Sequence, residues 1–92
     1  MCYEDNYYVL YTLNKYNVKI YIANTNPVYY TMNVADAKKF ANYDSAITEF
    51  TDYKDVFDRM IKYTDIVSIH VAEFNNLSQL KEERLLWFIQ IN

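Results

Sequence analysis

Residues 44–74, DSAITEFTDYKDVFDRMIKYTDIVSIHVAEF, contain the two segments that decide the fold. In the first segment, apolar residues recur at steps of three and four, the spacing of an amphipathic helix that lies on a sheet. They are Ala46, Ile47, Phe50, Tyr53, Phe57, Met60 and Ile61. We predict a helix that begins at an N-cap of Asp44 or Ser45 and ends at Tyr63. Within it, Thr51 and Asp52 offer a second cap that would divide the element into two helices.

The second segment, residues 65–74 (DIVSIHVAEF), predicts a strand in the interior of a sheet. It is dense in β-branched residues, which favour strands. One predicted face carries Ile66, Ala72 and Phe74, and the other carries Val67, Ile69 and Val71. A strand that is apolar on both faces is typical of a sheet with cover on both sides. The preceding helix would supply one of these covers.

The N-terminal third predicts a β-meander. Residues 7–13 (YYVLYTL) and 18–23 (VKIYIA) have the composition of strands, and the turn between them contains two Asn residues, which tolerate a positive φ better than most side chains. A second turn at residues 24–27 (NTNP) leads to a third strand at residues 28–32. Asn33 then predicts the N-cap of a short helical turn; the alternative is a last ragged strand that ends at residues 39–40.

The C-terminal part predicts a short helix or loop over residues 77–84 and a final strand over residues 85–91 (LLWFIQI). The whole chain of 92 residues is therefore expected to be a single domain of the α+β class. We expect an antiparallel sheet of four to five strands with one main amphipathic helix packed on it.

The chain contains no glycine, one His and one Cys. Phosphate-binding P-loops, dinucleotide-binding turns and EF-hand loops all need glycine where the backbone turns sharply or approaches a ligand. One His and one Cys cannot supply a Cys/His zinc site within one chain or an intramolecular disulfide. We therefore expect no cofactor and no metal.

The net charge of −3 argues against nonspecific binding to nucleic acid or to anionic membranes, because basic surface drives both. The first six residues, MCYEDN, are acidic and lack the basic start and apolar run of a signal peptide. No apolar stretch reaches the roughly 20 residues that span a membrane. These features predict a cytoplasmic protein that binds no membrane.

Ser68 and His70 lie two residues apart on one face of the predicted strand, so a Ser–His pair is conceivable. Their positions on the strand should be roughly 7 Å apart, and the sequence marks neither a third group that would orient the His nor an oxyanion hole. A lone His in a strand is more typical of packing. We expect no enzymatic activity.

Eleven tyrosines are more than a core of this size is expected to bury, because each buried hydroxyl needs a hydrogen-bond partner. Tyrosine is enriched at protein interfaces, although an AT-rich genome would also favour Tyr, Asn, Lys and Ile codons. The carboxylates of the predicted helix form either a solvated face or a negative band for a basic partner groove. The expected partner contacts are Tyr7, Tyr11, Tyr21, Tyr29, Tyr30, Glu49, Asp52, Asp55 and Asp58.

Residues 29–50 (YYTMNVADAKKFANYDSAITEF), followed by the strand at residues 65–69, resemble small proteins of phages and mobile elements of low-GC Gram-positive bacteria. The resemblance covers about half the chain. Such proteins include anti-CRISPR proteins and other inhibitors of host defence. The resemblance implies a stoichiometric binding protein whose partner is a host defence protein or ribonucleoprotein complex. The alternative is a structural or regulatory phage protein that uses the same tyrosines in a homodimer.

Overall fold

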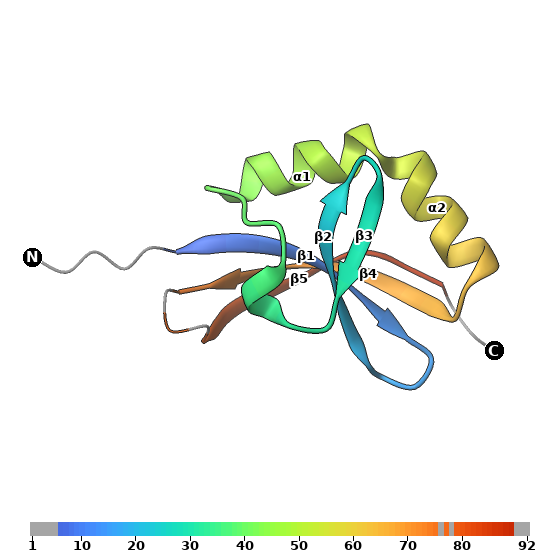
Figure 1. Ribbon diagram of the computed structural model, residues 1–92, viewed down its shortest axis with the longest axis horizontal. Helices are drawn as coiled ribbons and strands as arrows, with labels where there is room; N and C mark the ends of the chain where they lie inside the picture. The colour runs from blue at the N-terminus through green and yellow to red at the C-terminus, as the bar shows by residue number, and fades with distance from the viewer. Residues whose placement is uncertain (1–5, 76, 78, 90–92) are drawn as a thin grey trace, which may run out of the picture.

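The computed structural model describes residues 6–75, 77 and 79–89, which form one antiparallel sheet with two α-helices on one of its faces (Figure 1). The strand order is β3-β2-β1-β4-β5. This arrangement confirms the predicted α+β class. The elements are β1 (Tyr7–Asn14), β2 (Lys19–Thr25), β3 (Val28–Thr31), the short 3-10 helix η1 (Val34–Asp36), α1 (Tyr43–Asp52), α2 (Lys54–Tyr63), β4 (Ile66–Phe74) and β5 (Leu80–Phe88).

Inside the sheet, β1 pairs with β4, although the two strands come from distant parts of the chain. Their register pairs Tyr7 with Phe74 and Leu13 with Ser68, and it shifts at a bulge after Leu13. β4 has β1 on one side and β5 on the other. The interior strand predicted at residues 65–74 is thereby confirmed, starting one residue later.

The helical segment is divided into two helices at Tyr53, where the backbone leaves helical geometry. The backbone N–H of Tyr53 still donates to Glu49, and its carbonyl accepts from Val56 and Phe57, so few backbone groups are left unpaired at the break. The sequence had indicated a dividing point one to two residues earlier.

The N-cap of α1 is Asn42, whose side-chain oxygen accepts a hydrogen bond of 2.8 Å from the backbone N–H of Ser45. The prediction of Asp44 or Ser45 as the cap was wrong, because an Asn three residues before Ser45 already satisfies that donor. Asp44 instead lies in the first turn, where its negative charge is favourable at the helix N-terminus.

Residues 33–40 combine both predicted alternatives. Asn33 caps η1 by accepting from the N–H of Ala35, which confirms the predicted helical turn. Further along, Phe40 forms an isolated antiparallel bridge with Tyr8, with N–H···O distances of 2.8 and 2.9 Å in the two directions. The segment thus returns to the sheet after the turn.

The C-terminal strand β5 is longer than predicted, and the helix or loop expected over residues 77–84 is wrong from Leu80 onward. Here the strand pairing with β4 overrides helix propensity, and the polar residues are tolerated because β5 is an edge strand with solvent on one side. The final strand is confirmed over residues 85–88. Residues 90 and 91 of that prediction lie outside the described residues.

The two faces of the sheet are covered very differently. α1 and α2 pack on one face (Figure 1), where Leu10, Ile22, Ile69 and Val71 of the sheet meet Phe50, Phe57, Met60 and Ile61 of the helices. The other face holds a smaller cluster of Val9, Tyr11, Tyr21, Ala72 and Phe74, covered by Val34 and Ala37. The predicted faces of Ile66 and Val67 are wrong: beyond the bulge Ile66 joins the helix-side core, and Val67 lines a depression on the opposite face.

Candidate functional site

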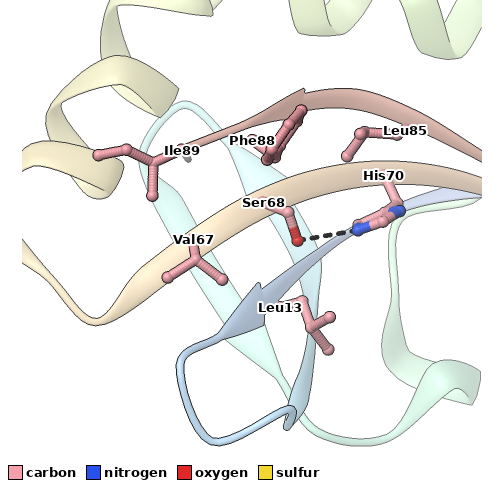
Figure 2. Close-up of a pocket in the computed structure, with 7 residues that line it drawn as sticks. All are labelled: Leu13, Val67, Ser68, His70, Leu85, Phe88 and Ile89. Carbon is pink, nitrogen blue, oxygen red and sulfur yellow. Dashed lines mark hydrogen bonds between the residues drawn. The ribbon is translucent and has the colours of Figure 1, made fainter. Parts of the chain in front are cut away.

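The part of the second face that residues 34–37 do not cover is a shallow, mainly apolar depression of about 450 Å³ (Figure 2). It lies where the end of β1, the start of β4 and the end of β5 come together. Its lining residues are Leu13, Val67, Ser68, His70, Leu85, Phe88 and Ile89. We call it the open-face depression.

Ser68 and His70 form a hydrogen bond in the wall of this depression, with 2.8 Å between Ser68 Oγ and His70 Nε2. The side chains therefore meet, although their positions on the strand are not adjacent. Burial, together with the charge of Lys19, lowers the pKa of His70, so the imidazole is neutral at pH 7 and can accept the Ser68 hydroxyl.

This pair has the character of packing rather than of a catalytic dyad. The His70 ring stacks on the ring of Tyr11, with centroids 4.9 Å apart and planes inclined by 7°. In a hydrolytic triad a carboxylate orients the imidazole, whereas here an aromatic ring lies against it. Ser68 itself is 5% exposed, which leaves little room for a substrate at its oxygen.

The structure separates the predicted contact tyrosines. Tyr11 is 1% exposed and Tyr21 is 9% exposed, so neither offers the surface that a partner would need, and that expectation is corrected. The reason is that both lie on inner strands beneath the segment that follows η1. Tyr7 is half-buried and stacks on Phe74, with 6.2 Å between ring centroids. Only the exposed Tyr29 and Tyr30, on the edge strand β3, retain accessible rings.

Glu49 was also expected to face a partner, but its carboxylate is engaged within the chain. Lys38 Nζ lies 2.6 Å from Glu49 Oε2, and the hydroxyl of Thr25 donates to the same oxygen. Burial raises the pKa of Glu49, but the hydrogen bonds from Lys38 and Thr25 outweigh this effect and hold the pKa below its usual value. Glu49 therefore links α1 to Thr25 of β2 and to Lys38 in the segment that precedes α1.

The other predicted carboxylates lie on the outer surface of the helices. Asp52 and Asp55 are exposed on either side of the break at Tyr53. Asp58 is paired with Lys54, one turn before it, at 3.1 Å. The structure thus places the acidic residues and the β3 tyrosines on different elements.

Three exposed tyrosines lie on segments that border a further depression, and two of them were not among the predicted contacts. Tyr16 in the β1–β2 turn is 68% exposed, and Tyr63 at the end of α2 is 75% exposed. Tyr30 of β3 lines a depression of about 260 Å³ together with residues 64–66. We call Tyr16, Tyr30 and Tyr63 the tyrosine end.

Backbone and side-chain contacts hold the segments of the tyrosine end together. The N–H of Lys15 donates to the carbonyl of Asp65 at 2.9 Å, and the side chains of these residues form an ion pair at 3.3 Å. The side-chain oxygen of Asn14 accepts from the N–H groups of Tyr16 and Val18, and Asn17 takes the positive φ of 66° that closes the turn. The predicted turn chemistry is confirmed here.

A sequence signal for Tyr16 and Tyr63 exists in retrospect. Each follows a lysine, in a polar turn or at a helix end, where no apolar periodicity draws the ring into the core. In the structure, Lys15 Nζ lies 5.2 Å from the Tyr16 ring centroid and Lys62 Nζ lies 5.6 Å from that of Tyr63. Such cation–π contacts leave the rings at the surface.

Within the described ranges, no group of three or more His, Cys, Asp or Glu side chains lies in a position to hold a metal ion. Among the same residues, no helix is long and apolar enough to cross a membrane. No protein-family model, curated protein or solved structure matches the chain.

Proposed function

We propose that this protein is a phage-encoded inhibitor of a host defence system, of the anti-CRISPR type, that acts by stoichiometric protein–protein binding through its tyrosine end. Its partner would be a host defence protein or ribonucleoprotein complex in the host cytoplasm. The observation that carries the proposal is a set of three exposed tyrosines at one open depression. Tyr30 lines the depression, and Tyr16 and Tyr63 lie within two residues of its lining residues Asn14 and Thr64.

Tyrosine suits this role for a physical reason. Its ring has two rotatable bonds, so it supplies a large contact area at a small cost in conformational entropy, and its hydroxyl can bond to the partner. At the tyrosine end the supporting backbone is already fixed by the hydrogen bond from Lys15 to Asp65. A surface that is ordered before binding loses less entropy when the complex forms.

The outer helix surface offers a second, electrostatic contribution. Asp52 and Asp55 are exposed, and the chain as a whole carries a net charge of −3. A negative surface favours association with a basic partner, as in nucleic-acid-binding grooves, by speeding the encounter. Asp58 contributes less because Lys54 neutralises it.

The experiment uses a bacterial host with an active CRISPR system and a phage that this system targets. The intact chain is expected to restore plaque formation and to co-purify with one defence component at a fixed ratio. The double variant Tyr16→Ala and Tyr63→Ala should lose both effects, because it removes two of the three exposed rings. Leu77→Ala is the matched control, since Leu77 is 70% exposed and lies in the β4–β5 turn, outside the tyrosine end.

Two outcomes would count against the proposal. One is unchanged phage restriction and no stoichiometric partner with the intact chain. The other is a double variant that binds and inhibits as well as the Leu77→Ala control, which would move the contact surface away from the tyrosine end.

A further inference from the structure

The outer edge of β5 is not paired with another strand of the described chain, and it has two unlike halves. Residues 81–84 are charged (KEER), and residues 85–89 are apolar (LLWFI). Charged side chains on an edge strand discourage pairing with other chains. The apolar half has no such protection, and Leu85, Phe88 and Ile89 are all exposed.

The register with β4 shifts by one residue between Leu85 and Trp87, and beyond this bulge the backbone of the apolar half is arranged for a further strand. The N–H of Ile89 donates to the carbonyl of Val67 at 2.7 Å, and Phe88 is aligned with Ser68. In an antiparallel ladder, neighbouring residues direct their N–H and C=O groups to opposite sides. The polar backbone groups of Phe88 therefore point outward from the sheet.

The distribution of charge along the β5 edge favours pairing of two copies through its apolar half. A two-fold antiparallel pairing centred on Glu82 or on Glu83 would place that carboxylate directly opposite its own copy. Like charges directly opposite each other are destabilising. If residues 85–89 pair with the same segment of the second copy instead, every charged residue of this edge lies outside the paired segment.

We propose that residues 85–89, the end of β5 and the residue after it, pair antiparallel with the same segment of a second copy, forming a two-fold symmetric dimer. The two sheets become continuous at this edge, and Leu85 and Phe88 beside the open-face depression lose exposed surface. A two-fold axis brings identical apolar segments together, so a second copy satisfies the edge without any additional partner. A domain of this size without disulfides gains stability from such association.

The test is sedimentation of the intact chain and two lysine variants over a wide range of protein concentration. Phe88→Lys places a charge in the proposed pairing. Tyr29→Lys is the matched control, because Tyr29 is on the opposite edge strand and is 59% exposed, against 55% for Phe88. The intact chain and Tyr29→Lys should change from monomer to dimer as concentration rises, whereas Phe88→Lys should stay monomeric.

Trp87, the single tryptophan of the chain, lies inside the proposed interface and gives a second measurement. Its fluorescence should change with concentration in the intact chain and not in Phe88→Lys. Circular dichroism checks that each variant is folded, and Leu85→Lys replaces Phe88→Lys if the latter is not. A monomer at every concentration, or a dimer that survives both β5 variants, would overturn the proposal. Neither result bears on phage restriction, so the two proposals can fail separately.

Discussion

Alternate residues of the same strands form the two faces of the sheet, and the two faces differ in how far they are covered. On the face below the helices, Leu10 and Ile69 are completely buried against α1 and α2. On the other face, Tyr11 is buried beneath residues 34–37, but Leu85 and Phe88, further toward the β5 edge, remain exposed. The first face holds the larger buried cluster, and the incomplete cover of the second leaves apolar side chains exposed.

The sharpest test of this difference is a large-to-small substitution on the helix face. Phe57 is 1% exposed and stacks on Phe50, with ring centroids 5.4 Å apart. Phe57→Ala should lower the free energy of unfolding by about 3–5 kcal/mol, because it removes buried apolar surface and leaves a cavity. Urea titration followed by circular dichroism measures this. A decrease in the unfolding free energy of less than about 1 kcal/mol would mean that the helix face is not the better packed of the two faces.

A smaller effect is expected at the link that fixes the helix layer to β2. Glu49→Gln removes the negative charge that Lys38 and Thr25 share, at an expected cost of about 1–2 kcal/mol, since Lys38 is partly solvent-screened. The exposed Asp55→Asn is the control and should change stability by less than about 0.5 kcal/mol.

The contacts of Glu49 with Lys38 and Thr25 also predict that the stability of the fold decreases in acid. Because the pKa of Glu49 in the folded state is below its ordinary value of 4.5, its contribution is complete above that pH and is lost as the pH falls further. Glu49→Gln should therefore flatten the stability curve in this acidic range. If the stability of the two proteins falls with the same slope below pH 4.5, Glu49 does not cause the acid dependence.

On the open face, the lowered pKa of His70 predicts that the stability of the fold also depends on pH nearer neutrality. Its pKa in the folded state is lowered by burial and by Lys19, so the unfolded chain takes up a proton first. Stability is therefore complete above the ordinary pKa of 6.5 and falls as the pH is lowered through it toward the folded value. His70→Asn should reduce this slope between about pH 7 and 5, measured by thermal unfolding in buffers of constant ionic strength.

The smallest effect is expected where the open face is bare. Phe88→Ala should change the unfolding free energy of the monomer by less than about 0.5 kcal/mol, because an exposed ring loses little contact with the chain. Measured in dilute solution beside Phe57→Ala, it compares two phenylalanines of one protein on opposite faces. A loss that approaches the Phe57→Ala value would mean that the depression is part of the core.

The sequence predicted those features that depend on local patterns. Apolar steps of three and four located the helical segment, and β-branched density located β4, because each pattern records which side of an element is buried. Asn-rich turns were also predicted correctly, and Asn17 does take the positive φ. The prediction for residues 80–84 was wrong because their polar composition suits an exposed edge strand as well as a helix. Only the pairing with β4 decides between the two.

The exposure of individual tyrosines was harder to predict, because exposure is a property of the whole fold. Nothing local distinguishes Tyr11, which is buried, from Tyr30, which is exposed: both lie in aromatic strand segments. The difference is that β1 is an inner strand and β3 is an edge. Likewise, the role of Glu49 depends on Lys38, which comes from a separate segment of the chain.

The pairing of β1 with β4 also determines when the protein can fold during its synthesis. The hairpin of β1 and β2 is made early, but β1 lacks its second neighbour until β4, residues 66–74, has been made. A fold dominated by such long-range pairs forms slowly compared with one built from local contacts. A chain cut after Tyr63 should therefore remain unfolded by circular dichroism, although it contains both helices and three of the strands. Folding of the sheet therefore waits for the synthesis of β4.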